Sequence, residues 1–192
     1  MATGKTTVAK LFSSLLGVEI IDADEIAHGL LAPGEKVWHK VVQSFGKDIL
    51  RNDSHIERKK LGENVFSNTS NRKKLENIIH PPVKKIIKEK LKQFKKNGKK
   101  WVVMDIPLLF EAKMERMMDK IIVVIRNENA QLDTLQKEKG LSLKEARERI
   151  ESQLPLSEKV KRAHFVIDNN GTLPDTEKRV KEICASLKLG IN

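Results

Sequence analysis

The stretch MATGKTTVAK (residues 1–10) decides the fold class of this chain. Its tripeptide Gly4-Lys5-Thr6 matches the end of the pattern G-x-x-x-x-G-K-[ST], a glycine-rich loop that joins a β-strand to an α-helix and holds phosphate groups. The first glycine of the pattern falls upstream of Met1, so only the second half of the loop is present. Because a lone tripeptide is weak support, the surrounding sequence has to decide whether the match is meaningful.

A predicted helix directly after the tripeptide supports the match. Residues 7–16 (TVAKLFSSLL) have the apolar spacing of a helix, and Gly17 is a typical residue to end it. A helix N-terminus offers unpaired N–H groups and the positive end of its dipole to an anion. In such a loop Lys5 reaches the β- and γ-phosphates of ATP and the Thr6 hydroxyl coordinates Mg²⁺, so we expect both ligands.

Four short apolar runs predict the rest of the fold. They are rich in β-branched residues and apolar at consecutive positions, as is typical of parallel strands covered on both faces. Helical stretches separate them, so the chain is predicted to be an α/β protein with a parallel sheet. The runs are VEII (18–21), WVVMDI (101–106), KIIVVI (120–125) and HFVID (164–168).

Residues 25–100, between the first two predicted strands, form a long insertion for a small α/β protein. They read as mostly helical, with turn signals at Pro33-Gly34, Asn52-Asp53 and His80-Pro81-Pro82. We interpret this segment as a helical substrate-binding lobe. Its last part, residues 81–100, is predicted to be an amphipathic helix with a lysine-rich wet face. The apolar positions of that helix are Val83, Ile86, Ile87, Leu91 and Phe94.

Residues 128–160 form a second charged helical stretch between predicted strands. Ser142 followed by Glu145 has the spacing of a capping box, which starts a helix. Charged helical segments in this position can close over a ligand, so we interpret this stretch as a mobile lid.

Composition limits the classes of function. The 192 residues suit one main domain, and 37 Lys and Arg against 26 Asp and Glu give a net charge of +11. Such a balance favours anionic partners, although a solvated lysine-rich surface explains it equally well. Tyr is absent and other aromatics are few, which argues against a base-stacking nucleic-acid binder.

The single cysteine, Cys184, excludes an intrachain disulfide and fits a reducing cytosol. With no apolar run of membrane-spanning length and no signal peptide, we expect a cytoplasmic protein without membrane partners.

Carboxylates follow two of the predicted strands. Asp22 and Asp24 in IIDADEIAH (20–28) come at the end of a strand, the edge at which open α/β sheets bind ligands. A carboxylate there can accept a proton from a substrate hydroxyl or hold Mg²⁺ through water, and the alternative is a helix cap. Asp105 resembles the strand-end aspartate that helps to hold Mg²⁺ in phosphate-loop enzymes. The apolar PLLFE run (107–111) behind it is either a ligand edge or ordinary loop packing.

Several segments together resemble the dephospho-coenzyme A kinase family. They follow the family's order over nearly the whole chain, and the DAD, HP and PLLFE elements distinguish this family from other small phosphate-loop kinases. The matching segments are ATGKTTVAKLF (2–12), IIDADEIAH (20–28), IERKKLGENVF (56–66), IIHPPVKK (78–85), MDIPLLFE (104–111), GLSLKEARERIESQLP (140–155) and FVIDNNGTL (165–173).

The resemblance implies transfer of the ATP γ-phosphoryl group to the ribose 3′-hydroxyl of dephospho-CoA, the last step of coenzyme A synthesis. It also implies a three-layer phosphate-loop NTPase fold with a helical substrate lobe and a helical lid. The implied parts are a core at 1–24, 101–127 and 161–192, a CoA-binding lobe at 25–100 and a lid at 128–160.

The resemblance also assigns roles to single residues. Asp24 would be the base that takes the 3′-hydroxyl proton, with Lys5 as the second catalytic residue, and Thr6 and Asp105 would hold Mg²⁺. Arg149 would be the lid cation on the phosphates, and Asn169 to Gly171 would lie near the adenine.

The ATP-binding residues that the resemblance implies are Ala2, Thr3, Gly4, Lys5, Thr6, Thr7, Arg149 and Asn169. The implied acceptor-binding residues are Asp24, Arg58, His80, Pro107, Leu108 and Phe110. From its sequence context alone, His80 reads as a turn residue without metal-ligand spacing around it.

The chain departs from the family at three places. Thr134 and Glu138 stand where the lid usually carries arginines, and Lys137 and Lys139 nearby lack the bidentate guanidinium fork. His164 stands where an acidic residue is usual before the last strand. The family's first strand and first loop glycines are absent, and that strand is usually central, between the segments 101–106 and 120–125. We expect the native protein to begin about ten residues upstream of Met1, which its intact mass would test.

Three other functions remain alternatives. Another phosphate-loop kinase would prefer a nucleotide or a shikimate-like acceptor over dephospho-CoA. A nucleic-acid-binding protein would use the basic charge and bind with steep salt dependence. An inactive remnant would keep the family's sequence and fail to bind ATP. We expect ATP and dephospho-CoA as partners and no nucleic acid, and the sequence does not decide the oligomeric state.

Overall fold

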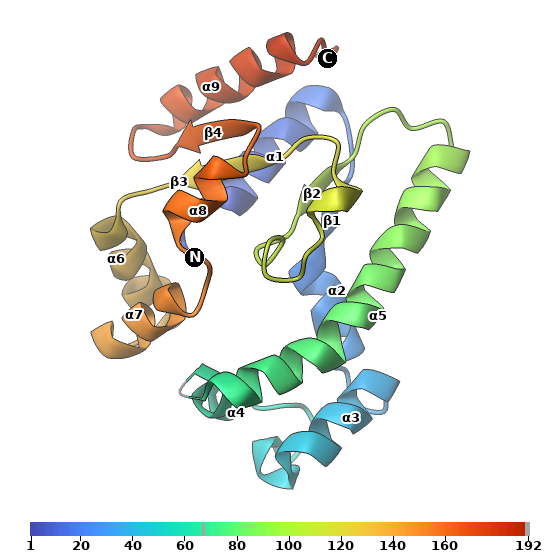
Figure 1. Ribbon diagram of the computed structural model, residues 1–192, viewed down its shortest axis with the longest axis vertical. Helices are drawn as coiled ribbons and strands as arrows, with labels where there is room; N and C mark the ends of the chain where they lie inside the picture. Colours follow the sequence, from blue (N-terminus) through green and yellow to red (C-terminus); the bar gives the residue numbers. More distant parts are fainter. Residues whose placement is uncertain (67, 191–192) are drawn as a thin grey trace. The chain divides into compact units, whose positions relative to one another are not determined.

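The computed structural model describes residues 1–66 and 68–190 (Figure 1). The chain divides into two compact units, one containing Met1–Ile21 and the chain from Lys99 onward, the other Asp22–Gly98. The first unit carries the strands, and the second is built from helices.

The strands of the described residues pair two by two. β1 (Ile20–Asp22) is hydrogen-bonded to β2 (Val103–Asp105), and β3 (Ile122–Ile125) to β4 (Phe165–Asp168). β3 and β4 run parallel, with Ile122 opposite Phe165 and Ile125 opposite Asp168, as the apolar runs predict. The two pairs are separate two-stranded sheets.

Helices cover both faces of the β3–β4 pair (Figure 1). α1 (Lys5–Leu16) and α9 (Leu173–Ser186) share a core with Val124 and Ile167. On the other face, α8 (Leu156–Lys161) packs against β3 in the cluster of Val123. Val123 and Val124 belong to different cores because successive side chains of a strand point to opposite faces. This arrangement is the layered α/β fold that the sequence predicts.

Two further helices follow β3. α6 (Glu128–Lys139) ends at Gly140, and α7 (Leu143–Glu151) starts at the predicted capping box, in which Ser142 and Glu145 bond each other's backbone N–H groups. The two helices pack together through buried Leu132, Leu135 and Ala146. A short 3₁₀ turn, η2 (Glu115–Met117), lies between β2 and β3.

The described part of the second unit is mostly helical, as predicted for this segment, with an isolated antiparallel bridge between Leu50 and Ile56. Its elements are α2 (Ala23–Leu30), α3 (Lys36–Phe45), the 3₁₀ turn η1 (Lys47–Ile49), α4 (Arg58–Phe66) and α5 (Thr69–Lys96). A core of buried Val37, Val41, Ile49, Leu61 and Val65 holds α3 and α4 together, and Leu75, Ile78 and Ile79 of α5 pack against it.

The predicted turn at His80-Pro81-Pro82 is wrong, because all three residues lie inside α5. Proline lacks the N–H that a helix interior needs and disfavours helical geometry in the residue before it. Packing outweighs this cost, since α5 packs against the unit's core through Ile79 before the prolines and buries Val83 and Ile87 after them. The prediction of an amphipathic helix holds for the part of 81–100 that lies in α5, which ends at Lys96.

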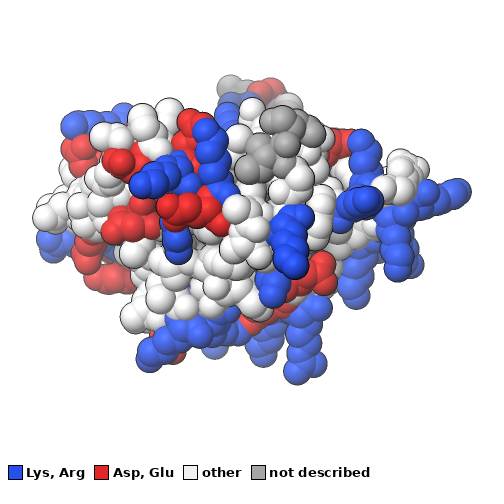
Figure 2. Space-filling view, turned by 90° about the horizontal axis from the view of Figure 1, so that it is seen from above, with Lys and Arg blue, Asp and Glu red and all other residues white. Residues whose placement is uncertain are grey.

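The surface is strongly charged. Figure 2 shows Lys and Arg side chains spread over the face that it presents, with Asp and Glu side chains among them. Along α5 the lysines at 85, 88, 90 and 92 are exposed while the apolar side is covered. Within residues 1–66 and 68–190, no helix has both the length and the apolar composition needed to cross a bilayer.

Candidate functional site

The half-loop at the start of the chain leads directly into α1. Gly4 caps this helix with φ 88° and ψ 18°, a left-handed conformation that glycine adopts without a steric penalty. Lys5 is the first residue of the helix, so the N-terminus of α1 lies where the motif predicts it. The positive end of the helix dipole and the cation of Lys5 therefore lie together, an arrangement suited to binding phosphate groups.

Thr6 and Asp105 meet although 99 residues separate them in sequence. The Thr6 hydroxyl donates a hydrogen bond of 2.7 Å to Asp105 Oδ2, and Asp105, the last residue of β2, is only 6% exposed. A hydroxyl and a carboxylate are the hard oxygen ligands that Mg²⁺ prefers, and Mg²⁺ takes its remaining ligands from water and phosphates. Among the described residues, no three His, Cys, Asp or Glu side chains cluster as a metal site. The pair therefore fits a magnesium ion that is shared with a nucleotide.

Asn169 supports the loop from β4. Its Nδ2 donates to Thr3 O at 2.9 Å, and its Oδ1 accepts from the Thr176 hydroxyl at 2.9 Å. Thr176 is only 1% exposed, so a buried hydroxyl holds the side-chain amide of Asn169 in place. A Cβ on Gly4 would lie 2.1 Å from Asn169 Nδ2, which shows how closely this side chain packs on the loop. The predicted contact of Asn169 with adenine remains a prediction.

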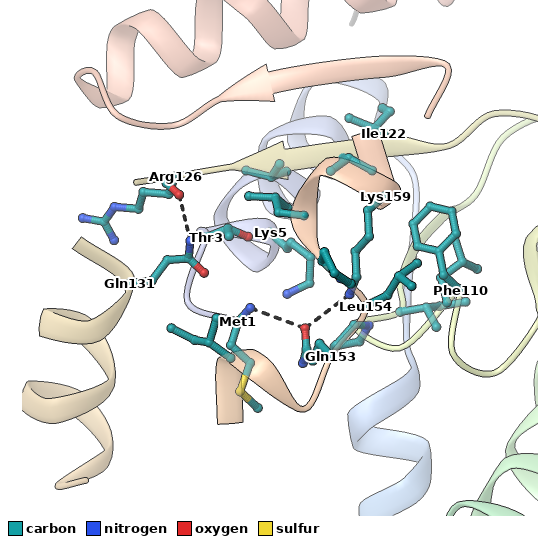
Figure 3. Close-up of a pocket in the computed structure, with 18 of the residues that line it drawn as sticks. Met1, Thr3, Lys5, Phe110, Ile122, Arg126, Gln131, Gln153, Leu154 and Lys159 are labelled. Carbon is teal, nitrogen blue, oxygen red and sulfur yellow. Dashed lines mark hydrogen bonds between the residues drawn. The ribbon is translucent and has the colours of Figure 1, made fainter. Parts of the chain in front are cut away.

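A cavity of about 490 Å³ lies beside the loop in the first unit (Figure 3). Thr3 and Lys5, β3, the loop after β2 and the connection between α7 and α8 line it. In Figure 3 the side chains of Lys5 and Lys159 extend toward it. Burial, and then the charges of Lys5 and Lys159, lower the pKa of the Met1 amino group to about 5. Three basic side chains, Lys5, Lys159 and Arg126, line this cavity.

The predicted acceptor-binding segment at 107–110 is the loop after β2. Pro107 and Leu108 are half-buried, whereas Phe110 is 7% exposed and packs with Ile121 and Val123. Phe110 thus packs within the core and also lines the cavity, together with Pro107. A role of this loop in binding the acceptor remains a prediction.

The remaining residues predicted to bind the acceptor lie in the second unit. Asp22 caps α2, with its Oδ1 accepting from Asp24 N at 2.8 Å and Glu25 N at 3.1 Å, so the helix-cap interpretation holds for Asp22. Asp24 is exposed in the first turn of α2, and Arg58 is exposed at the start of α4. His80 is half-buried within α5.

Sequence reasoning missed a cation at the end of the predicted core segment 101–127, just before the predicted lid. Arg126, directly after β3, donates from Nη1 to the Thr134 hydroxyl at 3.1 Å and lines the cavity. Lys137 pairs with Asp133 at 2.9 Å on the exposed side of α6, and Arg149 is half-buried on α7. The position of Arg126 at the carboxyl end of a parallel strand, where ligands bind in such sheets, could have revealed it.

Known proteins of one family match the chain almost throughout. The model of the dephospho-CoA kinase family matches residues 1–175. The chain belongs to the dephospho-CoA kinase family. A dephospho-CoA kinase of Carboxydothermus hydrogenoformans is 45% identical over 188 residues, which are 98% of this chain and 91% of the relative. One of Geobacillus kaustophilus is 42% identical over 183 residues, or 95% of this chain and 90% of the relative.

Solved structures agree with this family assignment. A dephospho-CoA kinase from Campylobacter jejuni has a TM-score of 0.67 and 32% identity, covering 97% of this chain and 92% of that one. The protein TT1252 from Thermus thermophilus has a TM-score of 0.76 and 29% identity, covering 97% and 93%. The fold is therefore the phosphate-loop NTPase fold of the family, and this dephospho-CoA kinase is an ATP-dependent phosphotransferase of coenzyme A biosynthesis.

Proposed function

We propose that this chain transfers the γ-phosphoryl group of ATP to the ribose 3′-hydroxyl of dephospho-CoA, using the residues that the motifs single out. Membership of the family supports the reaction. The hydrogen bond between Thr6 and Asp105 at the N-terminus of α1 is the structural observation that supports it best. It brings together the two oxygen ligands that a phosphate-loop kinase needs beside its phosphates.

The first unit binds ATP in this proposal. The loop residues from Ala2 to Thr7 hold the phosphates at the N-terminus of α1, and Lys5 neutralises charge on the β- and γ-phosphates. Thr6 and Asp105 would hold Mg²⁺, which would supply positive charge beside the phosphates of ATP. Asn169 keeps the loop in shape through Thr3 and adjoins the nucleotide. Arg149 supplies a further cation from the lid.

The second unit binds the acceptor. We assign the CoA-binding lobe to residues 25–100, and the compact helical unit Asp22–Gly98 supports this boundary. Asp24 takes the proton of the 3′-hydroxyl, for which its exposed carboxylate at the start of α2 is suited. Arg58 and His80 bind the acceptor from α4 and α5, together with Pro107, Leu108 and Phe110 from the loop after β2.

A closing segment completes the proposal. We assign the lid to residues 128–160, which contain α6, α7 and most of α8, and the core to 1–24, 101–127 and 161–192. Closure over bound ATP excludes water and so favours transfer to the acceptor over hydrolysis.

Acceptor screening tests the proposal. Purified chain is incubated with ATP and Mg²⁺, and ADP and phosphorylated product are measured with dephospho-CoA, adenosine, nucleoside monophosphates or shikimate as the acceptor. We expect rapid turnover only with dephospho-CoA, and no turnover when Mg²⁺ is chelated. Faster turnover of a nucleotide or of shikimate would contradict the proposal, as would binding of ATP without any transfer.

A further inference from the structure

α8 is bound to the loop after β2 by a buried ion pair. Lys159 Nζ lies 2.8 Å from Glu111 Oε1, and the two side chains are only 11% and 14% exposed. Glu111 is the last residue of the PLLFE run, and Lys159 is on α8, which belongs to the proposed lid. Buried ion pairs of this kind do little for stability in total but are very sensitive to the loss of one partner.

The same carboxylate fixes the connection between α7 and α8. Glu111 Oε1 also accepts a hydrogen bond of 2.9 Å from Leu154 N, and Lys159 Nζ donates to Gln153 Oε1 at 3.3 Å. Figure 3 shows Gln153, Leu154 and Lys159 together beside the cavity. One side chain of the loop thus holds both the helix and the turn that leads into it.

Arg162, directly after α8, makes a second contact with the chain that follows β2. The Arg162 guanidinium lies 4.7 Å from the ring centroid of Phe110, within the range of a cation–π interaction, and forms an ion pair with Glu115. Arg162 follows directly after α8, so both ends of this short helix are attached to the loop. These contacts fix the distance between the proposed acceptor loop and the end of the proposed lid.

One carboxylate oxygen of Glu111, Oε2, is buried without a hydrogen-bond partner among the described residues. A buried carboxylate oxygen without a partner is costly, so stability alone does not explain an acidic residue at this position. A group kept at such a cost is better explained by the geometry that it enforces.

We propose that Glu111 and Lys159 are positioning residues that anchor the base of the lid, at Gln153 and Leu154, to the loop at 107–110. The pair keeps the acceptor loop and the closing segment in register, so that closure brings the γ-phosphoryl group and the acceptor into line while excluding water. This inference rests on the proposed function and adds to it the residues that couple acceptor position to closure.

Charge-removing variants test the pair. Glu111→Gln keeps an oxygen that can accept from Leu154 N but removes the anion that pairs with Lys159, and Lys159→Met removes the cation that pairs with Glu111. We expect each to lower kcat about 10- to 100-fold, because small misplacements of reacting groups have effects of this size. We also expect the ratio of ADP formed to CoA formed to rise several-fold above one, with the Kd for ATP unchanged in Glu111→Gln.

Lys161→Met is the matched control. Lys161 is on the same helix and pairs with Glu158 at 2.7 Å, but its side chain is 71% exposed. Exposed pairs contribute little, so kcat and the ADP-to-CoA ratio should stay at wild-type values. A single variant leaves one buried charge without its counter-ion and can fold poorly for that reason. The double variant Glu111→Gln/Lys159→Met removes both charges, so it tests the proposal without this effect. It should fold like wild type and still show a raised ratio.

The outcomes separate positioning from stability and from the proposed function. A ratio of one in both single variants and in the folded double variant would overturn the positioning role. A fall in kcat that only follows the folded fraction, measured by circular dichroism at the assay temperature, would also overturn it. If wild type itself does not phosphorylate dephospho-CoA, the proposed function fails first, which the acceptor screen shows independently.

Discussion

Two aspartates with predicted roles in catalysis differ in how their surroundings hold them. Asp105, in the first unit, is buried and already accepts a hydrogen bond from Thr6. Asp24, in the second unit, is exposed in the first turn of α2. The packing of the first unit therefore already holds the two proposed Mg²⁺ ligands, Thr6 and Asp105, against each other.

The difference has a physical consequence for catalysis. Groups that are fixed in advance stabilise developing charge without a reorganisation cost, which suits Thr6 and Asp105. An exposed carboxylate keeps its hydration and becomes an effective base only when the substrate hydroxyl is placed against it. Variants at the loop that binds phosphate and variants at Asp24 should consequently change different kinetic constants.

Asp24→Asn should cause the largest loss. Removing a general base costs about 10²–10⁴-fold in rate, so kcat should fall by that factor while the Kd for ATP is unchanged. Steady-state kinetics with dephospho-CoA and titration with ATP measure the two quantities. Asp22→Asn is the matched control, because asparagine also caps a helix and this residue caps α2. Equal losses in both variants would argue against Asp24 as the base.

Core truncations should destabilise the two units separately. Ile167 and Ile87 are both fully buried, the first in the unit with the strands and the second in the helical unit. Replacing either by Ala should cost about 2–5 kcal/mol of unfolding free energy. Each unit has its own tryptophan, Trp101 and Trp38 respectively, so Trp→Phe variants leave one fluorescent reporter per unit. Urea unfolding should shift chiefly at the reporter of the mutated unit, and a common shift would mean that they unfold as one.

Gly4→Ala should damage the phosphate loop more mildly. The residue has φ 88°, and a left-handed conformation costs a non-glycine residue about 1–2 kcal/mol. The added Cβ also meets Asn169 Nδ2 at 2.1 Å, so the amide must move away from Thr3. We expect a higher KM for ATP with the KM for dephospho-CoA unchanged. If the clash matters, Gly4→Ala/Asn169→Ala will have a lower KM for ATP than the product of the two single effects predicts.

Local patterns predicted much of the fold. The G-K-T tripeptide, the four apolar runs and the capping box at Ser142 each depend on neighbours in sequence, and the structure has a helix or strand at each. The exact strand ends differ by one or two residues, as at Trp101, which is 47% exposed and lies outside β2. Such errors are expected because the ends of strands depend on pairing and burial, which a sequence run does not contain.

The parts that the sequence did not predict depend on distant contacts. The helix through Pro81 and Pro82 exists because Ile78 and Ile79 before the prolines pack on the core of the unit and Val83 and Ile87 after them are buried, which outweighs a local helix breaker. Arg126 meets Thr134 and Glu111 meets Lys159 only after the chain has folded. By contrast, the meeting of Thr6 and Asp105 could be predicted as a shared metal site, because both residues belong to motifs with a known chemical purpose.

The smallest effect is expected at the capping box that starts α9. The Thr172 hydroxyl, and then its backbone N–H, bond Asp175 Oδ2 and hold the pKa of this exposed carboxyl below its ordinary value of 3.8. A lowered pKa in the folded state means that the carboxylate stabilises the fold above that ordinary value and loses this contribution as the pH falls through the lowered pKa. Asp175→Asn should therefore be slightly less stable than wild type at neutral pH, and the difference should shrink in acid. Urea unfolding at a series of pH values measures it. In a Thr172→Val background, which lacks the stronger of the two hydrogen bonds, Asp175→Asn should cost less at neutral pH, and an undiminished cost would assign the stabilisation to the helix dipole instead.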